Sequence, residues 1–209
     1  MGLDRALFRW INGLSGHFSW LDNTISGFAS DYFMIVAMCL VLVAMWFGTR
    51  DKQKRLDNQV TVAAAMISLG LSSAMVALLN IFFVTNHMFE GTTIANLFNR
   101  PRPFNAEVGV NLLFYCPTDP SFPSNLAAVV FGLAFAVWLK NRKVGGWLLG
   151  MGALAALARV YVGIHYPGDM LGGAIIGLMG TAFAYGLIRI FWPIKRLLFW
   201  VLERLYLGG

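Results

Sequence analysis

Long apolar segments separated by short charged loops dominate this sequence, and few folds can accommodate that pattern. Five segments are long and apolar enough to approach the roughly 20 residues that cross a bilayer, at 32–48, 60–84, 124–139, 144–162 and 170–192. Charged residues make up only 12% of the chain, about half of their usual share in a soluble domain. The sequence therefore predicts an all-α integral membrane bundle of five or six transmembrane helices, folded as a single domain over residues 1–209.

The two ends of the chain differ from these apolar segments. Residues 1–30 are amphipathic and do not show the basic start and apolar run of a cleavable signal. We expect them to form an interfacial helix or a re-entrant pair, with Trp10, Phe18 and Trp20 at the level of the lipid headgroups. Residues 193–209 are predicted to form a cytoplasmic amphipathic tail.

Lysine and arginine residues gather in alternate connections between the predicted spans. The positive-inside rule assigns these connections to the cytoplasm. Their basic residues are Arg50, Lys52, Lys54, Arg55, Lys140, Arg142, Lys143, Arg189, Lys195, Arg196 and Arg204. Loop 85–122 and the turn around His165 then lie on the outer side. Because topology accounts for the net charge of +6, we expect a lipid bilayer and no nucleic acid as partner.

The stretch RVYVGIHYPGD, at 159–169, holds three ionisable residues between two apolar segments. Such groups are costly near a bilayer, and those that remain usually serve a function. Neutral His165 is a good nucleophile toward phosphorus, and Asp169 could orient its second ring nitrogen and stabilise the cation that forms. The alternative is that Asp169 only caps the fifth span and that His165 only packs in a turn.

Several residues of this stretch and of loop 99–122 are suited to binding phosphate. Guanidinium groups match phosphate oxygens and stay charged, and the candidates are Arg100, Arg102 and Arg159. Ser124 is a plausible helix cap, and Ser124 together with the amides of Asn125 and Leu126 could bind phosphate at the helix start. Interfacial snorkelling, loop salt bridges and a simple helix start are the alternative roles.

Small residues and cysteines add two further expectations. Gly146 and Gly150, like Gly173 and Gly177, are four residues apart and predict close helix contacts within the bundle, with a dimer face as the alternative. The oligomeric state is open. Two cysteines at positions 39 and 116 are expected at different depths, so neither a disulfide nor a metal site is predicted.

Together these motifs resemble those of the type 2 phosphatidic acid phosphatases, membrane relatives of the vanadium haloperoxidases. The family pattern is K-x6-RP, PSGH and SR-x5-H-x3-D. Arg102-Pro103 matches the first motif, Pro123-Ser124 begins the second, and the third matches at Arg159, His165 and Asp169. The resemblance covers residues 80–187, and the stretch INGLSGHFSWLD is similar to bacitracin-resistance-type undecaprenyl-diphosphate phosphatases.

This resemblance implies a specific activity and location. It implies a multi-pass protein of the bacterial cytoplasmic (inner) membrane, with its site on the periplasmic side. The implied reaction dephosphorylates undecaprenyl diphosphate through a phosphohistidine on His165, without a cofactor or metal. The substrate class is a polyprenyl or phospholipid phosphate, and phosphatidylglycerol phosphate and lipid A are alternative substrates.

The chain departs from the family pattern at four positions. Ala95 stands at the lysine position, Ala158 replaces serine and Asn125 replaces glycine. Leu126 stands at the catalytic position of the histidine that is thought to protonate the leaving oxygen. Two origins fit Leu126: a substitution introduced to stop turnover, or a native residue of a degenerate relative that binds phospholipid without cleaving it.

The loss of an acid should depend on the leaving group. A phosphate monoester expels an alkoxide, which needs a proton, whereas a diphosphate expels a phosphate whose second pKa is about 6. We therefore expect any residual activity to favour diphosphates over monophosphates.

Overall fold

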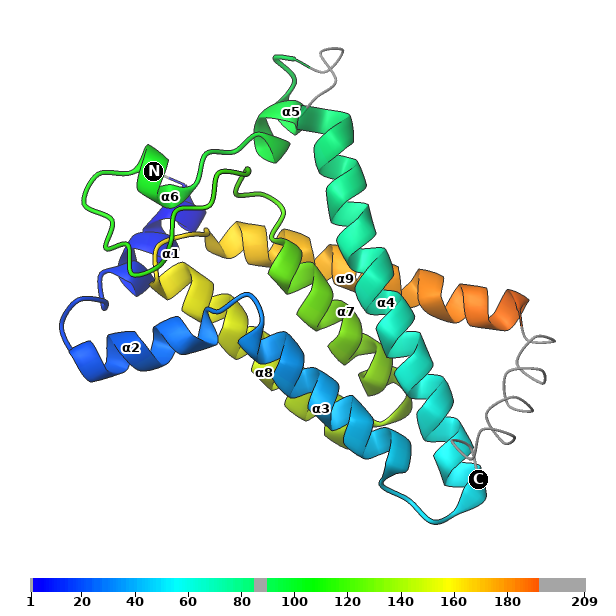
Figure 1. Ribbon diagram of the computed structural model, residues 1–209. Helices are drawn as coiled ribbons and strands as arrows, with labels where there is room; N and C mark the ends of the chain where they lie inside the picture. The colour runs from blue at the N-terminus through cyan, green and yellow to red at the C-terminus, as the bar shows by residue number, and fades with distance from the viewer. Residues whose placement is uncertain (1, 85–89, 192–209) are drawn as a thin grey trace.

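The computed structural model describes residues 2–84 and 90–191, and its regular structure there is entirely helical (Figure 1). The prediction of an all-α fold is confirmed. The helices are α1 (Leu3–Asn12), α2 (Ser19–Phe28), α3 (Phe33–Phe47), α4 (Lys52–Val84), α5 (Thr93–Phe98), α6 (Pro103–Ala106), α7 (Asn125–Lys140), α8 (Arg142–Tyr161) and α9 (Pro167–Ile190). The tail predicted for 193–209 lies outside the described residues.

Each of the five predicted apolar segments forms a helix, but the helices differ in length. α4, α8 and α9 are long and apolar enough to cross a membrane, and α2 with α3 forms a pair bent by 56° that could make one broken span. α7 is shorter, with 16 residues. The second segment was predicted to begin at residue 60, whereas α4 begins at Lys52. Residues 52–59 lack Gly and Pro, and the Asp51 carboxylate accepts the Lys54 amide, so the helix extends into polar sequence.

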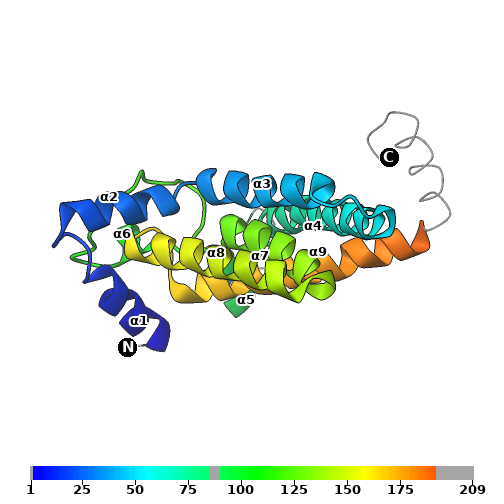
Figure 2. The same cartoon turned by 90° about the horizontal axis from the view of Figure 1, so that it is seen from below.

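Helix α7 lies at the centre of the bundle, among α3, α4, α8 and α9 (Figure 2). Ten of its residues are buried, because its small apolar side chains let the neighbouring helices approach from several directions. A helix that is apolar around most of its circumference is a core helix. This placement fixes the N-terminus of α7, where the candidate site begins.

Glycines on α9 allow close contact with α7, as the sequence predicts. A Cβ atom on Gly177 would lie 2.6 Å from the carbonyl oxygen of Ala128 and 2.6 Å from the amide nitrogen of Gly132. Gly146 and Gly150 on α8 differ, because a Cβ there would meet no atom within 4 Å. The expectation of close packing within the bundle is therefore confirmed for α9 and wrong for this pair on α8.

Residues 2–31 form α1, α2 and their connections rather than one interfacial helix. α2 packs on α8 and leads through the bend into α3. The side chains of Trp10, Phe18 and Trp20 are exposed, which leaves them available as interfacial anchors. This arrangement brings the α2–α3 bend to the same end of the molecule as the α8–α9 turn (Figure 1).

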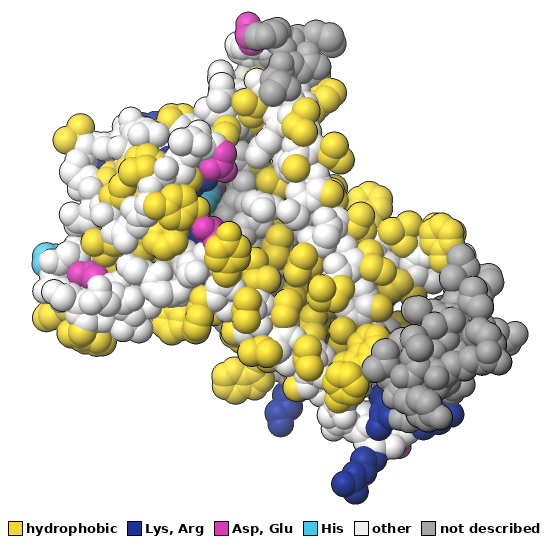
Figure 3. Space-filling view, in the orientation of Figure 1, with side chains coloured by type: hydrophobic (Ala, Val, Ile, Leu, Met, Phe, Trp, Pro, Cys, Tyr) yellow, Lys and Arg dark blue, Asp and Glu magenta, His cyan; other side chains and the backbone are white. Residues whose placement is uncertain are grey.

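Charge is distributed unevenly along the bundle. Lysine and arginine side chains protrude at the end where α3 joins α4 and α7 joins α8 (Figure 3). The turn that carries His165 lies at the other end, where acidic side chains and a histidine border a hollow. The connections that share positive charge in the sequence thus share one end of the fold, opposite the candidate site.

Candidate active site

A cavity of about 340 Å³ lies where α3, α7, the α8–α9 turn and loop 99–122 meet. Ionisable side chains form one part of its wall, and apolar side chains from α3 and α7 form another part. The lining residues are Asp31, Tyr32, Ile35, Arg102, Tyr115, Asp119, Pro123, Asn125, Leu126, Val129, Arg159 and His165. Three of the predicted site residues, Arg102, Arg159 and His165, therefore share one cavity with the helix start at Asn125 and Leu126.

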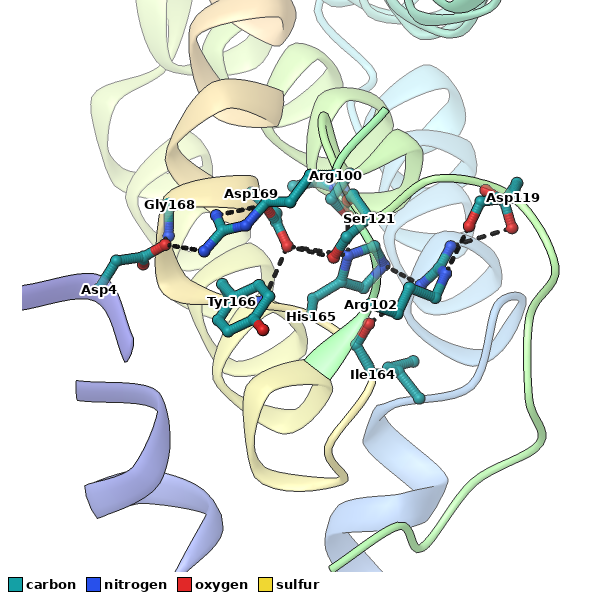
Figure 4. Close-up of polar contacts among 12 residues, drawn as sticks. Asp4, Arg100, Arg102, Asp119, Ser121, Ile164, His165, Tyr166, Gly168 and Asp169 are labelled. Atoms are coloured by element: carbon teal, nitrogen blue, oxygen red, sulfur yellow. Dashed lines mark hydrogen bonds and ion pairs between the residues drawn. The ribbon is translucent and has the colours of Figure 1, made fainter. Parts of the chain in front are cut away.

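The contacts of His165 define its protonation (Figure 4). Nη1 of Arg102 lies 3.1 Å from Nε2 of His165, and because a guanidinium can only donate, Nε2 must be the unprotonated acceptor. Nδ1 then carries the proton and donates to the carbonyl oxygen of Ser121 at 3.0 Å. Burial lowers the pKa of His165, against an opposing contribution from Asp169. The imidazole is therefore neutral at pH 7, with its Nε2 lone pair directed toward Arg102.

Asp169 caps the start of α9 and also lies beside the imidazole of His165. Its Oδ2 accepts the amide of Tyr166 at 2.8 Å and so caps α9. The same oxygen accepts the Ser121 hydroxyl at 2.5 Å and lies 3.6 Å from Nδ1 of His165. The carboxylate is fully buried behind the imidazole, where its negative charge would stabilise an imidazolium or a phosphohistidine.

Arg100 lies outside the cavity, although the sequence made it a candidate phosphate ligand. Its Nη2 contacts Asp4 at 2.7 Å, its Nη1 contacts Asp169 at 3.1 Å, and its guanidinium stacks over the ring of Tyr166 at 3.7 Å (Figure 4). This is the alternative role of a salt-bridging arginine. Arg100 joins α1 to the start of α9 and encloses the carboxylate behind His165.

Arg102 reaches into the cavity from the start of α6. Its Nε donates to the backbone oxygen of Asp119 at 2.9 Å, and its Nη2 pairs with the Asp119 carboxylate at 3.0 Å. Its Nη1 also donates to the carbonyl oxygen of Ile164 at 3.1 Å. These contacts fix the buried guanidinium beside Nε2 of His165, where it can bind a phosphoryl oxygen.

Arg159 enters the same cavity from the last turn of α8. Its Nη2 pairs with Oδ1 of Asp31, and Oδ2 of that carboxylate accepts the hydroxyl of Tyr115 at 2.7 Å. The guanidinium is buried, and its Nε has no hydrogen-bond partner within residues 2–84 and 90–191. A buried donor without a partner is unfavourable, so Arg159 has capacity for a further oxygen ligand.

The start of α7 contributes its backbone rather than the Ser124 side chain. Ser124 is the N-cap of α7: its Oγ accepts the amide of Ala127 at 3.3 Å, and the side chain is fully buried. Asn125 and Leu126, the first two residues of the helix, line the cavity. Amides at this position have no acceptor within the helix and favour anions.

The departures from the family pattern have different locations. Leu126 lines the cavity and also packs into the core cluster that contains Met38 and Val130. Ala95 on α5 and Ala158 on α8 are buried, and neither is among the described residues that line the cavity. Of the two alanines and the leucine, only Leu126 therefore lies in the wall of the cavity.

Four residues of this site have no counterpart in the sequence-based prediction, namely Asp31, Tyr115, Asp119 and Ser121. They are brought to the site by contacts between distant segments. Of the four, only Asp31 could have been noticed in the sequence, because it is a carboxylate placed directly before an apolar segment.

Across the described residues, no group of three or more His, Cys, Asp or Glu side chains is arranged to hold a metal ion.

The fold and this arrangement define a class of membrane protein, and comparison with known proteins identifies it. The PAP2 superfamily profile matches residues 67–194. The chain therefore belongs to the PAP2 superfamily, as its motifs predicted.

Individual relatives extend the comparison beyond the matched motifs. The chain is 32% identical over 178 residues to the undecaprenyl-diphosphatase BcrC of Bacillus subtilis (strain 168), covering 85% of this chain and 80% of that protein. The crystal structure of Aquifex aeolicus LpxE aligns with a TM-score of 0.64 and 25% identity, over 89% of this chain and 96% of that one. A transmembrane PAP2 type phosphatidylglycerolphosphate phosphatase from Bacillus subtilis shares the fold, with a TM-score of 0.55 and 17% identity over 90% and 88% of the two chains.

Proposed function

We propose that this protein is a membrane lipid phosphatase that removes the terminal phosphate of undecaprenyl diphosphate. The observation that carries the proposal is the unprotonated Nε2 of His165, which accepts a hydrogen bond from Arg102 in the wall of a cavity that Arg159 also lines. A neutral imidazole beside two guanidinium groups is suited to attack a phosphoryl group whose oxygens those groups bind. The similarity to a protein named undecaprenyl-diphosphatase supports the choice of substrate.

In the first step, Nη1 of Arg102 exchanges Nε2 of His165 for a phosphoryl oxygen. The freed lone pair of Nε2 then attacks the terminal phosphorus and displaces the lipid monophosphate. Arg102, Arg159 and the first amides of α7 stabilise the charge on the phosphoryl oxygens, and removing one such donor typically costs about 10²–10³-fold in rate. Asp169 lies behind the ring and stabilises the positive charge that develops on it. Water then hydrolyses the phosphohistidine and releases inorganic phosphate.

The lipid tail is accommodated by the apolar part of the cavity wall. Ile35 on α3 and Val129 on α7 line this part, next to Leu126. Beyond the cavity, the outer face of α3 exposes Val36 and Leu40. A polyprenyl chain can therefore lie along α3 in the bilayer while its diphosphate enters the cavity.

The position of the site supports an outward-facing enzyme of the bacterial cytoplasmic membrane. The basic connections lie at the end of the bundle opposite the α8–α9 turn. With these connections in the cytoplasm, the cavity would open on the periplasmic side.

A second function, binding of a lipid phosphate without cleavage, is favoured by one observation. Leu126 lines the cavity and cannot donate a proton. Diphosphatase activity is nevertheless compatible with leucine at position 126, because a phosphate leaving group needs little protonation.

Phosphate release from undecaprenyl diphosphate in detergent micelles separates the two functions. We expect release by the chain and none by His165→Gln, which retains an amide of similar reach but no nucleophile. Phosphatidylglycerol phosphate and lipid A serve as parallel substrates. Saturable binding of undecaprenyl diphosphate by the folded chain, with no release of phosphate from any of the three lipids, would establish the binding function instead.

A further inference from the structure

The α2–α3 bend places a carboxylate inside the cavity. The side chain of Asp31 lines it and is 37% exposed. One of its oxygens pairs with Arg159, and the other accepts the hydroxyl of Tyr115. A carboxylate bound to a guanidinium is ionised at neutral pH, so Asp31 is an ionised carboxylate in the same cavity as His165.

The second step of the proposed reaction needs such a base. Phosphohistidine is cleaved by water, and a group that accepts the water proton typically accelerates such a step by about 10²–10⁴-fold. Leu126 cannot accept a proton, and His165 itself carries the phosphoryl group at that stage. Among the described residues that line the cavity, two carboxylates remain, Asp31 and Asp119.

The contacts of the two carboxylates favour Asp31. Asp31 is held at both oxygens by donors from two different segments, whereas Asp119 is 66% exposed and is paired through Oδ1 with Arg102. Arg159 also keeps its Nε without a partner while its Nη2 holds Asp31. The same guanidinium can therefore bind a phosphoryl oxygen and keep the Asp31 carboxylate beside it.

We propose that Asp31 is the general base that activates water for hydrolysis of the phosphohistidine, with Tyr115 as its positioning residue. This inference rests on the proposed function and adds a residue to it. The water oxygen attacks phosphorus, the P–N bond breaks, and its electron pair returns to Nε2 of His165. The water proton passes to the Asp31 carboxylate and from there to solvent, and inorganic phosphate leaves. A site with this base and no acid suits diphosphates, whose first step needs no proton donor.

The test measures the phosphoenzyme directly. Undecaprenyl diphosphate labelled with ³²P at its terminal phosphate is mixed with the full chain, and the reaction is quenched in alkali, which preserves phosphohistidine. We expect Asp31→Asn to accumulate label on His165, because phosphorylation continues while dephosphorylation slows by about 100-fold or more. Hydroxylamine, a nucleophile that needs no deprotonation, should restore turnover to Asp31→Asn.

Two further variants keep the test independent of folding defects. Asp119→Asn tests the other carboxylate of the cavity: because Asp119 holds Arg102, we expect slower phosphorylation but no accumulation of label. Tyr115→Phe retains the carboxylate and loses one hydrogen bond to it, so dephosphorylation should slow by about fivefold. If Asp31→Asn does not fold, Tyr115→Phe decides the question.

Each outcome has a distinct meaning. If the role of Asp31 is purely structural, Asp31→Asn will slow phosphorylation, carry no more label than the unsubstituted chain, and not respond to hydroxylamine. That result overturns this inference but leaves the proposed function standing. Equal accumulation in the Asp31 and Asp119 variants also overturns it. If the unsubstituted chain transfers no phosphoryl group to His165, the proposed function fails and this inference fails with it.

Discussion

Restoring an acid at position 126 is the most informative perturbation of this site. Leu126 is the second residue of α7, lines the cavity, and is 8% exposed. An imidazole there would face the reaction space from the helix start. The substitution Leu126→His should therefore supply a proton to the leaving oxygen, while the proposed nucleophile His165 keeps its contacts.

The expected gain depends on the leaving group. A general acid contributes about 10²–10⁴-fold, which corresponds to about 2.7–5.4 kcal/mol of activation free energy at 1.36 kcal/mol per tenfold. A lipid monophosphate, which expels an alkoxide, should gain this full amount. For a diphosphate, the rate gain should be smaller by a factor of about ten or more, because its leaving phosphate is already stable as an anion. The loss of core packing by Leu126 should lower the free energy of unfolding by about 1–3 kcal/mol.

Matched lipid monophosphate and diphosphate substrates provide the assay. The ratio of their kcat/KM values is compared between the unsubstituted chain, Leu126→His, and the control Leu126→Gln, which is polar but not an acid. We expect the ratio to move toward the monophosphate only in the histidine variant. Equal gains on both substrates in folded protein would refute the argument from leaving groups.

Three further outcomes follow from the site and the bundle. Because burial lowers the pKa of His165, the rate of phosphoenzyme formation should stay constant as pH falls to 6.5, the ordinary histidine value, and should decline only below it. Asp169→Asn removes an interaction that raises the pKa of His165, so a stopped-flow pH profile of this variant should show the decline at a still lower pH. Arg100→Gln leaves Asp169 with one charge partner fewer and should reduce the free energy of unfolding by about 3 kcal/mol, with an unchanged KM because the side chain lies outside the cavity. In a denaturation series in detergent, Gly177→Ala should lower the free energy of unfolding by about 1–3 kcal/mol, because the added methyl group overpacks against α7. Gly186→Ala is the control: its added Cβ meets no atom within 4 Å, so the free energy of unfolding should change by less than about 0.5 kcal/mol.

Residues with local signals were predictable from the sequence. The apolar segments specify helices because hydrophobic length and composition act over neighbouring residues, and His165 with Asp169 follows from a fixed spacing across one turn. Ser124 was predictable as a cap for the same reason. Each of these expectations depends on residues within a few positions of one another.

Residues that meet across the fold were not predictable. Asp31 is 128 positions from Arg159 and 84 from Tyr115, so no local pattern connects them. Arg100 and Arg102 illustrate a second difficulty, because two arginines flanking a proline in extended backbone reach different surroundings. The sequence indicates that both are phosphate candidates, and only the packing of α1 and α9 decides that Arg100 pairs with buried Asp169 while Arg102 enters the cavity.

The central claim is that Nε2 of His165 becomes phosphorylated, and locating the phosphoryl group tests it most directly. The chain is incubated briefly with undecaprenyl diphosphate, quenched in alkali, digested and analysed by mass spectrometry. We expect a phosphorylated peptide whose modification lies on His165 and which is absent from His165→Gln. Release of phosphate with the modification on another residue, or with full activity retained by His165→Gln, would contradict it.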